Sequence, residues 1–324
     1  MIVMNENIAQ VLRVVRNKYY RFTMRSMQGK LRKKKNYQKK DFEQVKIAFA
    51  KKYNRICEFN DEKFTTPLWK EFNAKLEKIF LPSPPFDFLQ DPTIMRTMFA
   101  TAGGEWLERE LQFLETHAPK GKLKYLLEED YVGDPLLMQS RYLTSHTTIH
   151  HLYHFIKFLD VTKAKPSNIK TVVEWGGGYG NMIRILRKFF PKNTTYIMID
   201  TAVFCCLQWL YLSTLFGENN VHLLDNPKAK IQKNKINIVP LQFLENSKIK
   251  ADLFISTWAL SESGKASQDL VAKMNFFDAK HLLIAYQTNP IGLFDPARAG
   301  KLAQKRGAII EKIDFLPGNY YALR

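Results

Sequence analysis

The stretch VVEWGGGYGNM, residues 172–182, decides how the fold of this chain is read. Its four glycines come directly after an apolar run that ends in Trp175 and directly before a helical pattern. Glycine adopts positive φ without strain and lets the backbone approach a ligand closely. Because open α/β sheets bind ligands beyond the carboxyl ends of their strands, the stretch predicts a ligand-binding loop in an α/β fold.

The residues around this loop repeat a strand-then-helix pattern. Short runs rich in β-branched and aromatic residues alternate with helical stretches, which is typical of a mostly parallel sheet covered on both faces. We therefore expect an α/β, Rossmann-like, seven-stranded sheet in a domain that spans residues 145–324. The expected strands cover residues 171–175, 195–200, 236–241, 251–257, 281–287, 308–315 and 320–324.

Residues 1–144 predict a separate helical, basic region. Apolar residues recur there at the spacing of one helix face, and the segment LPSPPF at 81–86 interrupts any regular structure. The helices that we expect before the sheet cover residues 8–15, 66–80, 104–117 and 145–159.

Residues 201–216 form an uncharged stretch that invites a membrane interpretation. A spanning helix needs about 20 residues, and this stretch is shorter, follows a strand and contains Gln208. We therefore expect a helix buried against the sheet, with Cys205 and Cys206 as buried thiols. Together with Cys57 they make no disulfide framework, so we expect a cytoplasmic protein.

Two kinds of ligand compete for the glycine-rich loop. A dinucleotide loop requires G-x-G-x-x-G, but Asn181 stands where the third glycine should be, so we expect neither NAD nor NADP. The spacing E-x-G-x-G-x-G, from Glu174 to Gly180, instead resembles the cofactor loop of class I S-adenosylmethionine-dependent methyltransferases. The resemblance implies S-adenosylmethionine as cofactor and S-adenosylhomocysteine as product. It places the loop backbone around the methionine part and the Glu174 carboxylate near the amino group.

The resemblance also implies where the rest of the cofactor binds. Asp200 ends the second expected strand, 22 residues after Gly178, where its carboxylate would bind the ribose hydroxyls; the alternative is that it caps the next helix. Gln242 and Phe243 follow the third expected strand, where adenine is contacted, although Phe243 would also suit the core. The implied cofactor-binding residues are Glu174, Gly176, Gly177, Gly178, Tyr179, Gly180, Asp200, Thr201, Gln242, Phe243, Ser256 and Thr257.

Longer segments narrow the resemblance to the sugar O-methyltransferase group within class I. These segments are EWGGGYGNM (174–182), MIDTAVFCCLQWLYLSTLFG (198–217), STWALSE (256–262) and the VGDP loop (132–135). The resemblance implies methylation of a sugar hydroxyl in a glycan or in a nucleotide- or lipid-linked sugar. The residues expected to bind this acceptor are Asp134, Arg141 and Trp258.

Methyl transfer to a hydroxyl requires alignment of the reactants and is helped by a base. Glu262 follows the fourth expected strand and is the first candidate, with a structural role at a helix terminus as the alternative. His146, His150 and His154 recur at i, i+4 and i+8, so they lie along one helix face, and His146 is the second candidate; His151 is expected to point elsewhere. Because no Cys or acidic residue stands at ligand spacing beside them, we expect no metal.

Positive charge is concentrated at the start of the chain, whose net charge is +18. Residues 1–60 contain 16 Lys and Arg against four Asp and Glu, and seven of the eleven residues at 30–40 are positive. Such a strip suits an anionic membrane surface or a nucleic acid, and a solvated helix face is the alternative. The rival functions are therefore an RNA methyltransferase, less favoured because no RNA-binding module is recognisable, and a non-catalytic scaffold with a methyltransferase fold.

Overall fold

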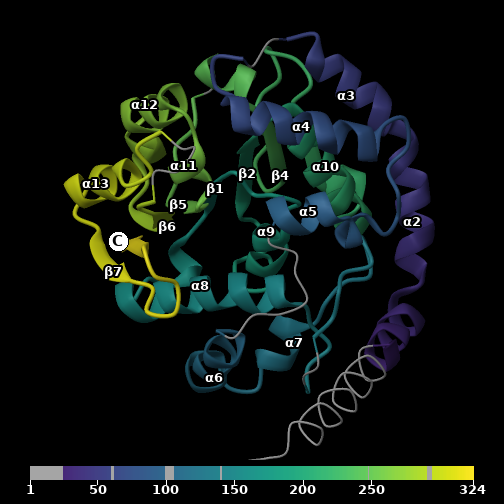
Figure 1. Ribbon diagram of the computed structural model, residues 1–324, viewed down its shortest axis with the longest axis horizontal. Coiled ribbons are helices and arrows are strands. Elements are labelled where there is room, and N and C mark those ends of the chain that lie inside the picture. Colours follow the sequence, from purple (N-terminus) through teal and green to yellow (C-terminus); the bar gives the residue numbers. More distant parts are fainter. Residues whose placement is uncertain (1–24, 60–61, 99–105, 139–140, 247, 290–293) are drawn as a thin grey trace, which may run out of the picture.

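A central sheet with helices on both faces organises the molecule in the computed structural model (Figure 1). The structure describes residues 25–59, 62–98, 106–138, 141–246, 248–289 and 294–324. The fold is the expected mixed α/β, Rossmann-like one, and helices precede the sheet along the chain. The helix expected over residues 8–15 lies outside the described residues.

The sheet has eight strands in the order β3-β4-β2-β1-β5-β6-β8-β7. All neighbouring pairs run parallel except those made by β8, which is antiparallel to both β6 and β7. The strands are β1 (Thr171–Trp175), β2 (Thr195–Asp200), β3 (Val221–Leu223), β4 (Ile236–Pro240), β5 (Leu253–Thr257), β6 (His281–Gln287), β7 (Ile309–Lys312) and β8 (Asn319–Leu323).

Seven of these strands are the ones expected, and the eighth, β3, corrects the predicted count. It has three residues and lies at one edge of the sheet, paired only with β4 among the described residues. A three-residue strand is too short to show a period of two in the sequence. Hydrogen bonds to β4 define it instead.

The strand order reverses at β1, which lies between β2 and β5. From β1 the chain proceeds outward to β2 and to the edge strand β3, adds β4 between these two, and then crosses to the other side of β1 as β5. In open α/β sheets this reversal opens a crevice beyond the carboxyl ends of the two central strands. The glycine-rich loop begins at the end of β1 and therefore lies at this crevice.

Each face of the sheet has its own hydrophobic core, because successive strand residues point to opposite faces. Val172 and Leu253 belong to the core shared with α8 (His146–Thr162), whereas Val173 and Phe254 belong to the core on the other face. The remaining helices on the two faces are α9 (Asn181–Leu186), α10 (Ala202–Phe216), α11 (Ala259–Glu262), α12 (Lys265–Lys273) and α13 (Arg298–Lys305).

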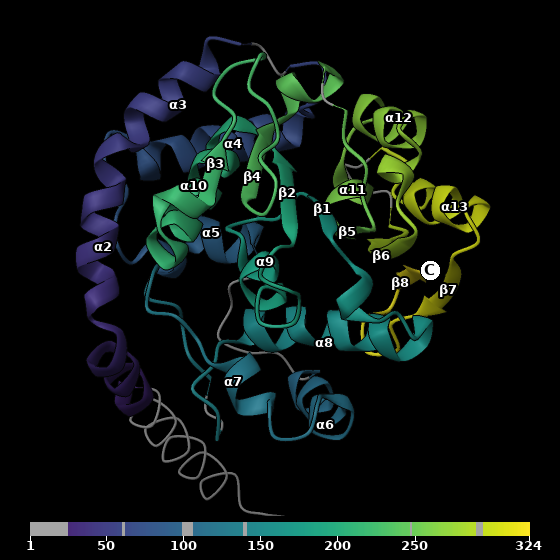
Figure 2. The same ribbon diagram turned by 180° about the vertical axis from the view of Figure 1, so that it is seen from behind.

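The first N-terminal helices, α2 to α5, wrap around the side of the sheet that carries α10, opposite α11 to α13, whereas α6 and α7 lie against α8 (Figures 1 and 2). Helix α10 contacts β2, β3 and β4 on one side and helices of the N-terminal region on the other. The N-terminal helices are α2 (Tyr37–Val45), α3 (Phe49–Cys57), α4 (Pro67–Phe80), α5 (Pro92–Thr97), α6 (Leu107–His117) and α7 (Leu123–Leu127).

This two-sided packing explains the uncharged stretch at 201–216. A helix that is covered all round is apolar all round, and Cys205, Cys206 and Trp209 are all buried in α10. Among the described residues, no helix combines the length and apolar character that crossing a bilayer requires. The expectation of a helix buried against the sheet is therefore confirmed.

Two predicted helices begin at side-chain caps. The Thr66 hydroxyl accepts a hydrogen bond from the Trp69 amide at the start of α4, and the Ser145 hydroxyl accepts one from the Thr148 amide at the start of α8. These caps satisfy backbone donors that a helix leaves open at its first turn. The N-terminal helices and the sheet share one hydrophobic cluster, and the domain division at residue 144/145 stays a prediction.

Candidate active site

A cavity of about 390 Å³ lies beyond the carboxyl ends of the central strands. Residues at or just after the ends of five strands line it: Gly176 after β1, Asp200 of β2, Leu241 after β4, Thr257 of β5 and Gln287 of β6. Their convergence follows from the parallel direction of these strands. The cavity therefore occupies the place that the glycine-rich loop predicts.

The loop needs glycine both for its backbone angles and for space. Gly176 and Gly178 have φ of 71° and 56°, values that favour glycine. A Cβ atom on Gly177 would come within 2.5 Å of the Met198 side chain and 3.0 Å of the Glu174 carboxylate. The loop is bare because its neighbours, the strand ends and the cavity leave no room for side chains.

The last two predicted loop residues differ in position. The Tyr179 ring lines the cavity and packs edge-on against Tyr211 of α10, with 5.0 Å between ring centroids. Gly180 does not line it, and instead has φ of 101° at the start of α9. A Cβ atom on Gly180 would lie 3.1 Å from Leu212, so this glycine allows the close approach of α9 and α10.

Glu174 brings a buried carboxylate to the base of the loop. Its side chain is 2% exposed and lines the cavity, and its Oε2 atom has no hydrogen-bond partner among the described residues. Burial, with a smaller contribution from the nearby Asp200 carboxylate, raises the pKa of Glu174 to about 8. A carboxylate that is buried without a hydrogen-bond partner is stabilised by a cation placed beside it.

The Asp200 carboxylate accepts hydrogen bonds at the end of β2. Its Oδ1 accepts from the Thr201 amide at 2.9 Å, and its Oδ2 accepts from the Gln208 side chain at 2.8 Å. Burial raises the pKa of Asp200 to about 7. Gln208 also donates to the Gly178 carbonyl at 3.0 Å, so it joins the loop to Asp200. No spacing along the chain predicts this link, because it is made between two elements.

Besides Gly180, three predicted cofactor residues do not line the cavity. The Gln242 amide donates to the backbone carbonyls of Ile56 and Phe59, and the Phe243 ring is buried with its edge against Phe59. The Ser256 hydroxyl is buried and accepts from the Leu260 amide. Leu241, directly after β4, lines the cavity instead of Gln242 and Phe243.

Aromatic side chains from the N-terminal region complete this side of the cavity. Phe64 and Trp69 line it together with Phe204 of α10, and the rings of Trp69 and Phe204 meet edge to face at 5.7 Å. Their contribution was not predicted, because nothing in the sequence links α4 to the end of β2. The N-terminal region thus forms part of the site.

The opposite wall consists of the segment that follows β5. Thr257, Trp258 and Glu262 all line the cavity, as expected. Trp258 has a positive φ of 66°, and its indole N–H donates to the Asn319 side chain at 2.6 Å. Burial raises the pKa of Glu262 to about 7, and Gln287 approaches its carboxylate at 3.4 Å.

His146, His150 and His154 of α8 lie in a row, with 5.9 Å between the ring centroids of the first pair and 4.0 Å between those of the second. His150 and His151 line the cavity, whereas His146, the second base candidate, is fully buried and absent from the cavity wall. His151 points in another direction from His150: its Nδ1 atom lies 3.1 Å from the Asn181 side chain at the start of α9, whereas His150 contacts Glu110 of α6. The His150 ring stacks on the Trp258 indole with 5.5 Å between centroids.

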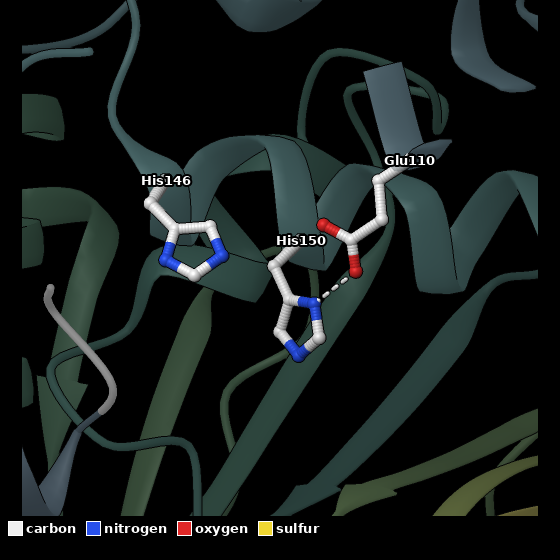
Figure 3. Close-up of side chains that lie close together, drawn as sticks. All are labelled: Glu110, His146 and His150. Atoms are coloured by element: carbon white, nitrogen blue, oxygen red, sulfur yellow. Dashed lines mark hydrogen bonds and ion pairs between the residues drawn. The ribbon is translucent and has the colours of Figure 1, made fainter. Parts of the chain in front are cut away.

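Glu110 of α6 supplies the acidic partner that the sequence did not reveal. Its Oε1 lies 2.5 Å from the Nδ1 atom of His150 (Figure 3). Glu110, His146 and His150 each place one ligand-type atom within 4.8 Å of the others. We expected no acidic neighbour because none stands at ligand spacing along the chain. Packing of α6 on α8 nevertheless brings Glu110 to His150 from 40 residues away.

Two predicted acceptor-binding residues lie elsewhere. Asp134 is buried and accepts hydrogen bonds from Gln28, Arg32 and Gln90. Arg141 is exposed and pairs with Glu115. Neither is among the residues that line the cavity, because other charged and polar groups already hold them.

Part of the basic strip at 30–40 pairs with the segment 128–134 of the same chain. Arg32 contacts Asp134 at 2.6 Å, Lys34 contacts Glu128 at 2.9 Å and Lys35 contacts Asp130 at 2.7 Å. Lys30, Lys33, Lys39 and Lys40 are exposed. The strip therefore has an internal role as well as an exposed charge.

Comparisons with known proteins found similar solved structures only. No protein-family model and no curated protein sequence matches the chain. Mitomycin 7-O-methyltransferase MmcR is 11% identical with a TM-score of 0.37, over 80% of this chain and 68% of that one. A SAM-dependent methyltransferase from Aquifex aeolicus is 16% identical with a TM-score of 0.33, over 51% and 88%.

LaPhzM is 13% identical with a TM-score of 0.34, and the match covers 55% of this chain and 57% of LaPhzM. The chain thus spans little more than half the length of that structure. At such identities and scores, the likeness defines no activity.

Proposed function

We propose that this chain is an S-adenosylmethionine-dependent O-methyltransferase that acts on a sugar hydroxyl. The observation that supports it best is the buried Oε2 atom of Glu174, which has no hydrogen-bond partner among the described residues and lies beside the glycine-rich loop. A buried carboxylate needs compensation, and an ammonium group provides it. The amino group of S-adenosylmethionine therefore fits this position.

The rest of the cavity suits the other parts of the same cofactor. Asp200 offers a carboxylate at the end of β2, where ribose hydroxyls would donate to it. Leu241, Trp69 and Phe204 offer an apolar wall for adenine. The exposed Arg96 of α5 also lines the cavity and offers a cation for the cofactor's carboxylate.

The segment after β5 would perform the chemistry. When bound, S-adenosylmethionine supplies a methyl group on a positively charged sulfur. Glu262 would accept the proton of the acceptor hydroxyl, so that the oxygen becomes nucleophilic as the bond to the methyl carbon forms. Because its pKa is raised to about 7, Glu262 is suited to this exchange near neutral pH.

The acceptor side of the cavity combines polar groups with flat aromatic ones. Glu262, Gln287 and Asn319 lie among the lining residues with the indoles of Trp175 and Trp258. Carboxylate and amide groups bind hydroxyls, and indole rings pack on the C–H faces of a sugar ring. This lining supports the sugar acceptor that the sequence resemblance implies.

Calorimetry with S-adenosylhomocysteine tests the cofactor site. We expect Glu174→Gln to weaken binding by about tenfold or more, since a hydrogen bond to a charged group contributes about 1.5–3 kcal/mol. The exposed Glu218 offers the matched control, Glu218→Gln, whose affinity should not change. Equal affinities of the folded wild-type and Glu174→Gln proteins would remove the main support for the proposal.

Transfer of a labelled methyl group identifies the acceptor class. The protein would be incubated with labelled S-adenosylmethionine and with separate fractions of glycan, nucleotide-linked sugar, lipid-linked sugar and RNA. We expect label in a sugar fraction. Label in RNA alone would replace the sugar acceptor with a nucleic acid, and no label together with tight cofactor binding would favour a non-catalytic scaffold.

A further inference from the structure

We propose that Glu110, His146 and His150 bind a divalent transition-metal ion beside the cavity. Figure 3 shows the three side chains converging from α6 and α8. Their ligand-type atoms lie within 4.8 Å of one another, and the residues are 0%, 0% and 3% exposed. Burying three such groups in one place is costly unless their polar atoms are compensated.

The supporting elements give the cluster the geometry of a metal site. His146 and His150 are one helical turn apart, so both imidazoles lie on the same face of α8. Glu110 comes from α6, which packs against α8. Two imidazoles and one carboxylate are a common zinc ligand set that leaves a fourth position open.

Glu110 itself argues for an ion and not only for a hydrogen bond. Its Oε1 contacts His150, but its Oε2 is buried without a hydrogen-bond partner among the described residues. A carboxylate used only to orient a histidine would leave this second oxygen uncompensated. Coordination by Glu110 would place a positive charge directly at the carboxylate.

The Glu110–His150 distance allows this pair to coordinate an ion after a small rearrangement. A tetrahedral ion with bonds of about 2.0–2.1 Å keeps its ligand atoms roughly 3.3 Å apart. Glu110 and His150 are closer than this, at 2.5 Å, so binding must separate them by less than about 1 Å. Rotation of the carboxylate about its terminal bond, which is a soft torsion, can provide such a shift.

The donor set selects the class of ion. Imidazole nitrogen favours zinc and its transition-metal neighbours, whereas magnesium and calcium prefer sites made of oxygen ligands. The cluster has two imidazoles and one carboxylate. Zinc is therefore the ion that the cluster suits best, with cobalt as its spectroscopic substitute.

The ion would also connect to the cavity. His150 belongs both to the cluster and to the cavity wall, where its ring stacks on Trp258. An ion bound by Glu110 and His146 would fix the His150 ring against this indole. The metal would therefore shape the wall of the cavity that includes Trp258.

Cobalt binding to the full-length, chelator-treated protein tests the site without any cofactor. We expect one Co²⁺ per chain, visible absorption typical of a nitrogen-containing low-coordinate site, and displacement by Zn²⁺. Glu110→Gln and His146→Ala should each weaken Co²⁺ binding by about tenfold or more, because each removes one of three protein ligands. His117→Ala is the matched control, since His117 is an exposed histidine on the same helix as Glu110.

Thermal unfolding separates a lost ligand from a lost fold. Zn²⁺ should raise the unfolding temperature of the wild-type and His117→Ala proteins, and it should leave a folded Glu110→Gln protein unchanged, because only a bound ion stabilises the native state. Absence of micromolar Co²⁺ binding by the wild-type protein would overturn the proposal. So would Glu110→Gln and His146→Ala proteins that bind Co²⁺ as tightly as the wild type. Because binding is read without S-adenosylmethionine, either failure is distinct from failure of the proposed methyl transfer.

Discussion

Three carboxyl groups in the cavity wall have pKa values that burial raises. Glu174, Asp200 and Glu262 all line one cavity, and burial raises the pKa of each to about 8, 7 and 7. Carboxylates kept near their midpoint at neutral pH respond strongly to a nearby ligand charge. A cationic cofactor would thus favour ionisation of the two carboxylates that bind it, and the acceptor proton would go to the third.

The proposed base makes a prediction about pH. Glu262 must be ionised to accept a proton, so turnover should fall as the pH decreases below about 7 and level off above it. Glu262→Gln should lower kcat by about 10²–10⁴-fold and abolish this limb of the profile. Rates of methyl transfer between pH 5.5 and 9 measure both effects.

The control for Glu262→Gln is its affinity for S-adenosylhomocysteine, which should remain within about twofold of the wild-type value if the residue serves only the acceptor. A variant that keeps the wild-type rate and its acidic limb would show that another group accepts the proton.

The same residues show how far sequence reasoning reaches. Most of the loop, Asp200 and the segment after β5 line the cavity, and each directly follows a strand whose pattern is clear. Gln242 and Phe243 do not line it, whereas Leu241 does, and their role in cofactor binding stays a prediction. Glu110 and Gln208 could not be predicted, because their partners lie on other elements and no spacing along the chain records such contacts.

At the scale of elements, a buried ionic network fixes the helix that follows the glycine-rich loop. Arg184 of α9 is 1% exposed and contacts Glu129 at 2.9 Å, Asp130 at 3.1 Å and the Thr148 hydroxyl of α8 at 2.6 Å. Glu129 in turn accepts from Ser145 and Thr148. The network therefore ties α9, α8 and the segment before α8 into one support for the loop.

Removing the arginine should destabilise this support. Arg184→Met leaves the buried Glu129 carboxylate without its cation, and we expect a loss of about 3–5 kcal/mol in the free energy of unfolding. Urea unfolding measures this loss. The neighbouring, half-buried Arg187 contacts Tyr196 and Phe216 through their rings, and Arg187→Met should cost only about 0.5–1 kcal/mol.

Similar losses in the two arginine variants would mean that the network adds little beyond packing.

The elements themselves were mostly predictable, since long apolar runs and capped helices leave clear periodic signals. The three residues of β3 were not, because pairing with β4 alone makes them a strand.

At the scale of the whole molecule, the excess of positive charge has two different uses. Arg32, Lys34 and Lys35 hold the segment 128–134 against the N-terminal helices, whereas Lys30, Lys33, Lys39 and Lys40 are exposed on the same strip. An anionic surface or polymer would meet the exposed group. Substitution of the exposed lysines should therefore change association with such a surface, and substitution of the paired residues should change stability.

Replacing the four exposed lysines with glutamine should weaken association with anionic phospholipid vesicles. It should also reduce the salt dependence of this association, because fewer positive charges remain whose attraction to the lipid salt can screen. Stability should change by less than about 0.5 kcal/mol, as is usual for surface substitutions.

Replacing Arg32, Lys34 and Lys35 should instead lower stability, since Asp130 is largely buried and the Lys35 ammonium helps to hold its pKa low. Vesicle co-sedimentation at several salt concentrations, together with urea unfolding of both triple and quadruple variants, measures the contrast. Unchanged vesicle binding by the quadruple variant would leave the exposed lysines as a solvated helix face.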